Sequence, residues 1–283
     1  MMEGKKAFPY SWEEAIDLLR KDPRHQDLIF DAYLTSDLQG NCRRFAESSE
    51  FAETMELIRA HRPNAEDVLD VPAGNGIATY ALAKAGFDVV AVEPDPSPSV
   101  GRGAIASTLA ATGLPARIVA AFGENLPFET GSFDVVYVRQ GLHHAHDLSA
   151  MLREYARVLR RGGLLLGCRE HVVDNYETSL RDFLASQADH QLYGGEHAFT
   201  LADYRSAFAG AGLTMIEEFG PYDSPINLHP NTPESLVDKI NESGPGRILG
   251  LVLSRSVVGR LGMWRLRRSN RPGRLYSFVA RAP

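Results

Sequence analysis

The sequence has little cysteine, and its two cysteines fit neither a metal-ligand spacing nor a disulfide framework. Cys168 lies in an apolar run, so we expect it to be a reduced residue of the core. No run of about 18 apolar residues occurs, so no membrane-spanning helix is expected. The first ten residues hold two lysines but no apolar stretch like that of a signal peptide. These features favour a cytoplasmic protein, at most peripheral to the inner membrane surface.

Acidic residues are absent from position 247 onward, although that segment contains nine of the 30 basic residues, all of them arginine. The rest of the chain therefore carries 21 basic against 36 acidic residues, a net charge of −15. An acidic body argues against broad nucleic-acid binding, and no nucleic-acid partner is expected. Residues 247–268 mix arginine with aliphatic residues and tryptophan, which is typical of a segment that contacts a membrane surface or an anionic substrate. A helix whose apolar side packs on the domain is the alternative.

Helices and strands are expected to alternate through most of the chain. Residues 1–65 read as helices only, with candidates at 11–19, 23–34 and 49–60. Apolar runs then predict strands, at 68–71, 87–92, 117–121, 133–138, 164–168, 214–219 and 275–280. Helical patterns lie between them, at 77–85, 99–112, 148–159, 178–186, 201–211 and 233–243. This alternation predicts an α/β fold with a mainly parallel sheet.

Two glycines, Gly74 and Gly76, join the strand at 68–71 to the following helix. In an open α/β sheet this turn lies at the carboxyl edge, where ligands bind, and glycine lets the backbone approach them closely. The dinucleotide pattern G-x-G-x-x-G is incomplete, because Thr79 occupies the position of its third glycine. Asp70 precedes the turn; its carboxylate disfavours a pyrophosphate but suits the cationic amino-acid end of S-adenosylmethionine. Both points argue against a nicotinamide dehydrogenase.

A second acid, Glu93, follows the strand at 87–92, about 20 residues beyond the glycine turn. A carboxylate in this position accepts hydrogen bonds from ribose hydroxyls. A solvated loop residue is the alternative, but the pairing with the glycine turn favours a nucleoside ligand.

The motifs, taken in order, resemble the class I (Rossmann-like) S-adenosylmethionine-dependent methyltransferases, in particular the type 11 subgroup. Five blocks carry the resemblance: the glycine turn, the strand-end acid, the L-P-F…G-S-F-D-V-V block at 126–136, Leu142-His143-His144, and R-V-L-R-R-G-G at 157–163. It implies a seven-stranded sheet, mostly parallel with an antiparallel last strand, and helices on both faces. It further implies an N-terminal helical lid (1–65), a cofactor-binding core (66–172), and substrate-side helices with the last strands and a C-terminal insertion (173–283).

S-adenosylmethionine is the cofactor that the resemblance implies, with S-adenosylhomocysteine as the product. The methionine part would lie near Asp70 and the ribose on Glu93. The family often has an aspartate at position 122 for the adenine; here we expect Phe122 to pack on the ring and the Gly123 amide to donate a hydrogen bond. Pro72 stands where the family usually has its first glycine. The expected cofactor-binding residues are Asp70, Pro72, Ala73, Gly74, Asn75, Gly76, Glu93, Pro94, Phe122, Gly123, Glu124 and Gln140.

Histidines near the carboxyl edge are candidates for a general base, because imidazole titrates near neutrality and an alcohol acceptor must lose a proton. Shaping the site or capping a helix is the alternative role. The candidates are His143, His144, His171 and His197. The acceptor is expected to contact Glu170, Tyr193, Glu196 and Arg43, with 193–197 as a substrate loop. No metal site is expected, because H-H-x-H with Asp147 has no counterpart in the family pattern.

The expected activity is methyl transfer to a small-molecule acceptor, by O-methylation of a sugar or natural-product hydroxyl. In-line transfer requires alignment of the acceptor with the methyl group, with a histidine or glutamate as base. C-methylation, or a non-catalytic accessory protein that binds S-adenosylmethionine, are the alternatives. The sequence leaves the oligomeric state open.

Overall fold

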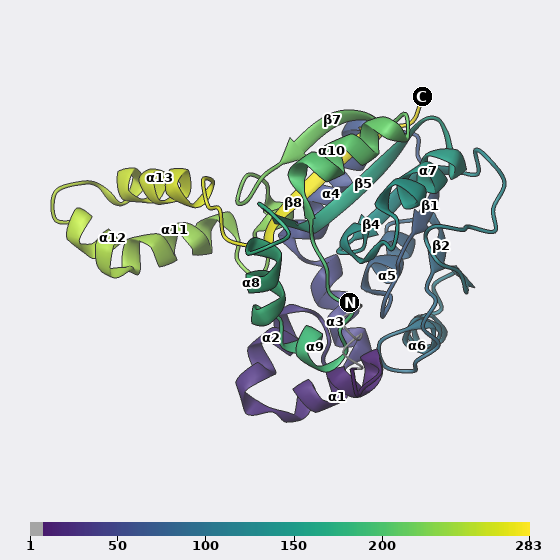
Figure 1. The fold of residues 1–283 in the computed structure, drawn as a ribbon, viewed down its shortest axis with the longest axis horizontal. Helices are drawn as coiled ribbons and strands as arrows, with labels where there is room; N and C mark the ends of the chain where they lie inside the picture. The colour runs from purple at the N-terminus through teal and green to yellow at the C-terminus, as the bar shows by residue number, and fades with distance from the viewer. Residues whose placement is uncertain (1–7) are drawn as a thin grey trace.

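The computed structural model describes residues 8–283, and its centre is one sheet of eight strands (Figure 1). Seven strands follow the order β3-β2-β1-β4-β5-β8-β7, and the short β6 pairs with β5. β8 is antiparallel to β5 and β7, and the other pairs are parallel. The predicted fold class is therefore confirmed. The strands are β1 (Asp67–Asp70), β2 (Asp88–Val92), β3 (Arg117–Val119), β4 (Phe133–Arg139), β5 (Leu159–Val173), β6 (Phe199–Thr200), β7 (Thr214–Phe219) and β8 (Arg274–Arg281).

Helices surround the sheet and also extend away from it. Those before β5 are α1 (Trp12–Lys21), η1 (Pro23–His25), α2 (Gln26–Asp31), α3 (Leu38–Ala46), α4 (Ser49–His61), α5 (Ile77–Lys84), α6 (Arg102–Thr112), η2 (Leu142–His144) and α7 (Leu148–Val158). Those after β5 are α8 (Ser179–Ser186), α9 (Ala188–Leu192), α10 (Leu201–Gly210), η3 (Pro225–Asn227), α11 (Pro233–Glu242), α12 (Gly244–Leu249) and α13 (Arg255–Leu266).

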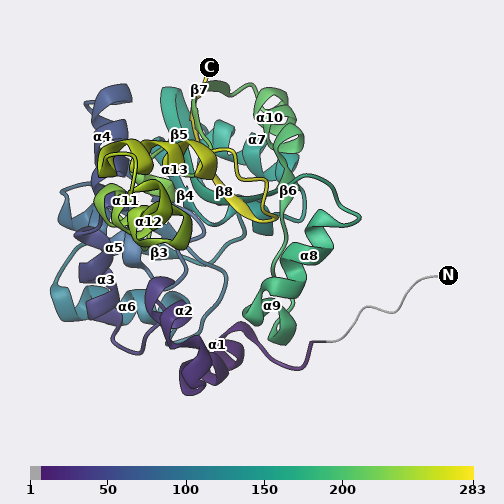
Figure 2. The same cartoon turned by 90° about the vertical axis from the view of Figure 1, so that its left-hand side faces the viewer.

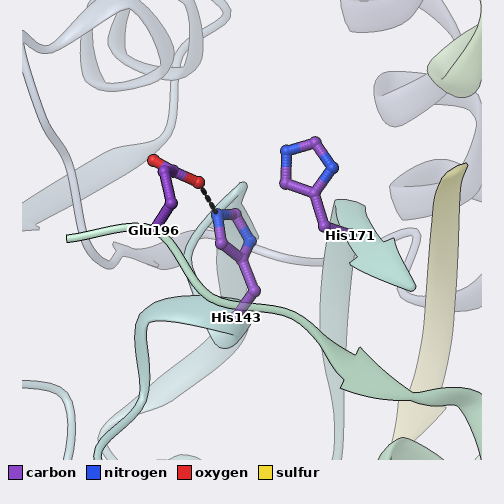
Figure 3. A group of neighbouring side chains, drawn as sticks. All are labelled: His143, His171 and Glu196. Carbon is purple, nitrogen blue, oxygen red and sulfur yellow. Dashed lines mark ion pairs between the residues drawn. The ribbon is translucent and has the colours of Figure 1, made fainter. Parts of the chain in front are cut away.

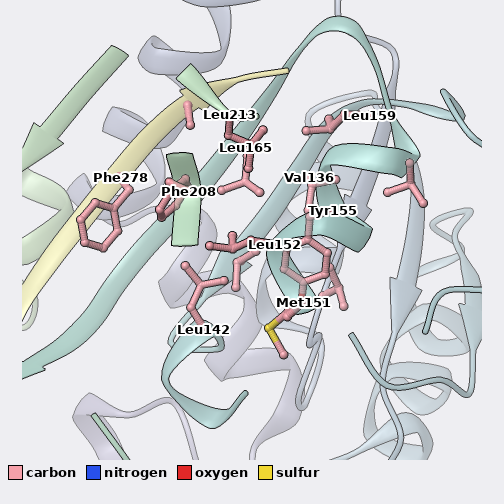
Figure 4. Packing of buried hydrophobic residues seen from close by; sticks show 14 of the residues in the cluster. Val136, Leu142, Met151, Leu152, Tyr155, Leu159, Leu165, Phe208, Leu213 and Phe278 are labelled. Carbon is pink, nitrogen blue, oxygen red and sulfur yellow. The ribbon is translucent and has the colours of Figure 1, made fainter. Parts of the chain in front are cut away.

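Both faces of the central strands are apolar, because alternate residues of a strand point to opposite sides of the sheet. On one side Val136 and Leu165 pack with Tyr155 of α7 and Phe208 of α10 (Figure 4). On the other side neighbouring strand residues pack with side chains of α3, α4 and α5. The expected helices on both faces are confirmed, and the sheet is held rigidly between two cores.

Three sequence expectations need correction. The helix expected at 23–34 is broken into η1 and α2, and it stops at Asp31 because Tyr33 adopts a left-handed backbone conformation (φ 59°). No separate helix was expected at the position of α3, although residues 1–65 as a whole were expected to be helical. The strand expected at 164–168 extends back to Leu159, because Gly162 takes a φ of 68° and the chain stays extended on both sides of it. Leu159 pairs with Phe133 of β4.

The N-terminal helices pack in two different places. α3 and α4 pack against the sheet, where Phe45 and Ile58 are fully buried. α1 and α2 instead form a separate small core with the start of α6 and with α9, built around Ile16 and Ile29. Among the described N-terminal helices, α1 and α2 are the ones that border the cavity described below, together with the segment after α2.

Helices α11, α12 and α13 form a hairpin that projects from the body between β7 and β8 (Figures 1 and 2). α13 packs on α11, with Gly259 against Val237 and Gly262 against Ile240, rather than on the sheet. Within the basic segment, α13 therefore packs its buried side, Val258 and Gly259, on α11. Within residues 8–283, no helix combines the length and apolar character needed to span a membrane. Residues 1–7, to which the signal-peptide expectation partly refers, lie outside the described range.

Candidate active site

The turn between β1 and α5 depends on its two glycines for different reasons. Gly74 and Gly76 both have positive φ angles, 53° and 86°. A side chain at Gly76 would come within 2.9 Å of Ile105, so crowding adds to the conformational requirement. At Gly74 a Cβ would meet nothing within 4 Å, so the backbone there faces open space. The turn thus presents bare backbone to a ligand.

Asp70 ends β1 beneath this turn and is 1% exposed. Its Oδ2 accepts a hydrogen bond of 2.6 Å from the Thr79 hydroxyl, while its buried Oδ1 has no partner among residues 8–283. Burial raises the pKa of Asp70 to about 7, although the Thr79 hydrogen bond favours the charged form. A buried carboxylate oxygen with an open lone pair fits a cationic ligand group.

Glu93 lies one hydrogen bond behind the glycine turn. Its carboxylate accepts hydrogen bonds from the amides of Gly74 (2.8 Å) and Asp95 (2.9 Å). Burial raises the pKa of Glu93 to about 7, with the two amides acting in the opposite sense. The adjacent backbone is fixed by Arg102, which donates to the carbonyls of Glu93 and Pro94. The acid is therefore held against the turn, as a ribose contact requires.

A cavity of 370 Å³ opens beside the turn, bounded by α1, α2, the ends of β4 and β5, and the segment before β6. Apolar walls come from Trp12, Leu28, Leu34 and Leu275. Ten of the sequence-predicted site residues line this cavity: Asp70, Pro72, Ala73, Gly74, Asn75, Gln140, His143, His144, His171 and Glu196.

The other predicted residues lie outside its lining. Phe122 is 62% exposed. Gly123 is covered by Tyr155, because a Cβ atom added at Gly123 would lie 2.5 Å from the Tyr155 hydroxyl. Glu124 accepts a hydrogen bond from the His146 amide. The adenine contacts therefore stay predictions. Not brought to the cavity are Gly76, Glu93, Pro94, Phe122, Gly123, Glu124, Glu170, Tyr193, His197 and Arg43.

Three of these residues have other surroundings. Arg43 is exposed on α3. The Tyr193 ring packs against Trp12, with centroids 5.5 Å apart. The His197 ring lies parallel to Tyr176 and edge-on to Phe199. The 193–197 segment thus contributes Glu196 alone to the cavity lining, and the rest of it packs on neighbouring elements.

His143 is the buried centre of a charged group. Its Nδ1 lies 2.7 Å from Glu170 and its Nε2 lies 3.5 Å from Glu196. Glu170, fully buried, also accepts the amides of Gly141 and His143, which fixes the turn after β4. Although burial opposes its charge, the hydrogen bonds to both carboxylates raise the pKa of His143 to about 10.

His144 and His171 are neutral by contrast. Burial lowers the pKa of His171 to about 4, helped by the charge of His143, and it also lowers the pKa of His144. His171 Nδ1 donates to the Gly273 carbonyl (2.8 Å) and His144 Nδ1 donates to the Gly195 carbonyl (2.9 Å). In each neutral ring the other nitrogen, Nε2, is therefore a proton acceptor.

A buried ion cluster beneath the cavity was missed in the sequence. Glu50 of α4 is 0% exposed and binds Arg139 at 2.6 Å and 3.1 Å, with Arg169 at 3.7 Å. Both arginines line the cavity. Arg169 also donates to the carbonyls of Ile226 and His229, which fastens the 221–231 loop to the site. Their position near the carboxyl ends of β4 and β5 was the available signal.

Comparison with known proteins bears on what this site does. Residues 69–167 match the family described as "Methyltransferase domain". The chain is 37% identical over 124 residues to a demethylmenaquinone methyltransferase of Mycolicibacterium gilvum, covering 42% of this chain and 50% of that protein. It is 38% identical over 169 residues to the protein of the same name in Mycolicibacterium vanbaalenii, covering 59% and 70%. The match thus spans about half the length of the first relative.

Among solved structures, a geranyl diphosphate methyltransferase in complex with S-adenosylmethionine superposes with a TM-score of 0.57 at 16% identity. The superposition covers 94% of this chain and 95% of that chain. This likeness supports the fold assignment, from sheet order to flanking helices.

Proposed function

The chain belongs to the class I S-adenosylmethionine-dependent methyltransferases, and we propose that it methylates a ring carbon of a hydroquinone-like small molecule. As a member of that family it is an enzyme that uses S-adenosylmethionine as its methyl donor. This acceptor differs from the sugar hydroxyl that the sequence led us to expect. It takes up the alternative left open there, a carbon acceptor.

Two features support an aromatic acceptor. The relatives are named for demethylmenaquinone, a quinone whose reduced form carries ring hydroxyls. The cavity offers an apolar side, with Trp12, Leu28 and Leu275, next to the neutral ring of His144. That juxtaposition of apolar wall and neutral imidazole is the observation on which the proposal rests, because a hydroquinone has both a flat apolar ring and an acidic hydroxyl.

The residues of the cavity, together with Glu93 behind its glycine turn, fit the donor. When bound, S-adenosylmethionine supplies a methyl group on a sulfonium. The unpartnered Oδ1 of Asp70 would hold its ammonium group, and Glu93 would hold the ribose hydroxyls. His144 Nε2 would accept the hydroxyl proton of the acceptor, which makes the ring more electron-rich at the carbon that takes the methyl group. The helices α1 and α2 border this end of the cavity through Trp12, Leu28 and Asp31.

Donor binding is expected to weaken as the pH falls from about 8 to about 6. Asp70 and Glu93 have pKa values raised to about 7 in the free protein, and both must be ionised to bind a cation or accept from hydroxyls. Binding strength is therefore present above pH 7 and lost below it, by up to about tenfold per pH unit for each group. Calorimetry at the two pH values measures this, and Asp70→Asn should flatten the profile. Equal affinity at both values would contradict it.

The Glu93→Ala variant tests the donor site directly. Loss of a carboxylate that accepts from ribose hydroxyls should weaken S-adenosylmethionine and S-adenosylhomocysteine by about 1.5–3 kcal/mol, or roughly 10- to 100-fold. Calorimetry on wild type and variant gives the ratio, with Glu56→Ala on the exposed side of α4 as the control. Unchanged affinity for both compounds would remove Glu93 from the site.

The acceptor proposal has its own assay. Purified enzyme with labelled S-adenosylmethionine should methylate a reduced naphthoquinone and leave sugars unmodified. Mass spectrometry of the product distinguishes a carbon-bound from an oxygen-bound methyl group. Methylated sugar, or a methyl ether of the hydroquinone, would overturn the proposal even if the donor binds as expected.

A further inference from the structure

The geometry points to a site for one divalent transition-metal cation formed by His143, His171 and Glu196. One ligand atom of each residue lies within 4.8 Å of the others, and the side chains converge from η2, β5 and the segment before β6 (Figure 3). All three residues line the cavity, so a cation held by them would face the acceptor. From the sequence no metal site was expected, because H-H-x-H with Asp147 has no counterpart in the family pattern; the group found here takes only His143 from that motif.

The outer contacts of both imidazoles are those of metal-binding histidines. Such histidines usually pass their second ring nitrogen to a carboxylate or a backbone carbonyl, which fixes the ring. His143 Nδ1 contacts Glu170 at 2.7 Å, and His171 Nδ1 donates to the Gly273 carbonyl at 2.8 Å. Each ring therefore directs Nε2 to the shared space.

The distances and ligand types also fit. Bonds of about 2.0–2.2 Å to a tetrahedral zinc ion place ligand atoms about 3.4 Å apart. His143 Nε2 and Glu196 already lie 3.5 Å apart, so any contraction from the 4.8 Å spread of the group would occur at His171. Two imidazoles and one carboxylate favour zinc or a related ion over magnesium or calcium. Three protein ligands leave a position open, as in catalytic zinc sites.

The role of such a cation rests on the proposed function, whereas its binding does not. In the open position it would take the hydroxyl oxygen of the acceptor and lower the pKa of that hydroxyl. His144 is not needed as a ligand and stays available for the released proton. Without a cation, protonated His143 forms an ion pair with Glu196 across the same space.

Metal binding is measured on the full chain, stripped with a chelator and titrated with zinc chloride by calorimetry and with cobalt(II) by visible absorption. We expect one ion per chain and a cobalt spectrum typical of tetrahedral coordination. His171→Ala and Glu196→Gln should weaken binding at least 100-fold, and Glu170→Gln by about 10- to 100-fold. His146→Ala, an exposed histidine of the same turn, is the matched control and should bind as wild type.

Binding of no ion, or binding that survives His171→Ala and Glu196→Gln, would overturn the metal site. Circular dichroism of each variant checks that it is folded. Because the titration needs neither donor nor acceptor, its failure leaves the proposed methyl transfer untouched. Conversely, a metal-loaded chain without methyltransferase activity on hydroquinones would count only against the proposed acceptor.

We also propose that the tip of the α11–α13 hairpin docks on an anionic lipid surface, on independent evidence. The largest exposed apolar side chains of the tip are Ile248 (70% exposed), Leu251 (84%) and Val252 (79%). They belong to α12 and the turn after it, which form the far end of an arm that projects from the body (Figures 1 and 2). Isolated exposed leucines are ordinary, but three such residues clustered at a projecting tip are not.

Charge selects the kind of surface. Residues 232–268 contain seven basic and three acidic residues, whereas the whole chain has a net charge of −6. Arg260 and Arg265 are exposed on α13. A hollow of 670 Å³ between α11 and α13 combines Met263 and Trp264 with further arginines. An apolar tip with a basic flank, on an otherwise acidic protein, complements anionic headgroups over an acyl region.

Sedimentation with vesicles of phosphatidylglycerol and phosphatidylcholine tests the docking surface. The full chain should bind anionic vesicles and lose binding in high salt or with phosphatidylcholine alone. Leu251→Asp with Val252→Asp should abolish binding, and Arg260→Glu with Arg265→Glu should reduce it at least about 25-fold, at about fivefold per arginine. Leu18→Asp, an exposed leucine of α1, is the control and should bind as wild type.

Two results would overturn this proposal. One is absence of vesicle binding by the wild type at low salt. The other is concentration-dependent dimerisation without lipid that Leu251→Asp and Val252→Asp abolish, since the tip would then be covered by a second copy of the chain. Ultracentrifugation of the wild type and the double variant distinguishes the two occupants.

Discussion

Replacing Glu170 with alanine is expected to lower the free energy of unfolding by about 3–5 kcal/mol and methyl transfer at least about 100-fold. The carboxylate is fully buried and accepts from two amides and from His143 Nδ1. Its removal leaves these donors unsatisfied, at about 1–3 kcal/mol each before relaxation. The turn that carries His143 and His144 would shift, and a misplacement of about 1 Å can cost 100-fold in rate.

Urea denaturation and initial rates at saturating donor measure the two effects. Glu170→Gln keeps the shape and one acceptor oxygen, so it should recover part of the stability but not the ion pair with His143. The control is Asp147→Ala, which removes an exposed cap of α7 and should cost about 1 kcal/mol. A stable Glu170→Ala protein with normal kcat would show that Glu170 does not organise the turn.

Glu50→Ala should destabilise the protein by about 3–5 kcal/mol, because it leaves two buried guanidinium groups without their counter-charge. Arg139 is 10% exposed and Arg169 8% exposed at the side chain, and both depend on Glu50. The arginines hold the pKa of Glu50 below its usual value despite burial. Its stabilisation is therefore present above the ordinary carboxyl pKa and is lost as the pH falls through the lowered one.

Urea, which carries no charge, is the suitable denaturant for this measurement. Glu56→Ala breaks an exposed pair with Arg59 on the same helix and should cost at most about 1 kcal/mol. Since Arg139 and Arg169 line the cavity, Glu50→Ala should also weaken donor binding in the fraction that stays folded. A loss no larger than that of Glu56→Ala would mean that the buried arginines find other partners.

The sheet was predictable from the sequence because its central strands are buried on both faces. Such strands are continuous apolar runs, as in Val135–Val138, and their alternation with helices implies parallel crossovers. The ends of individual strands were less predictable where pairing with neighbouring strands overrides the local sequence signals for a helix end. Gly162 and Gly163 resemble a helix end, but Leu159 pairs with Phe133 of β4 and Leu164 with Arg281 of β8, so the strand runs on both sides of them.

The residues of the site also fall into those that the sequence could predict and those that it could not. Asp70, Gly74 and Glu93 were predictable because they occupy fixed places relative to strand ends. Glu50 was not, because it lies on α4 and reads as one more acid on a polar helix face; only packing against β4 and β5 reveals that it is buried. The meeting of His171 with Glu196 likewise depends on how the chain returns after α9, which no local pattern encodes.

The hairpin between β7 and β8 leaves and re-enters the body at neighbouring points. Asn231, before the hairpin, and Arg271, after it, line one small hollow. Ile226 and His229, which accept hydrogen bonds from Arg169, both precede the hairpin in the chain. Antiparallel strands can be joined by a short turn, and the residues of the arm take no part in the pairing of β7 with β8. The pairing of β7 with β8 therefore sets no requirement on the length of the arm between them.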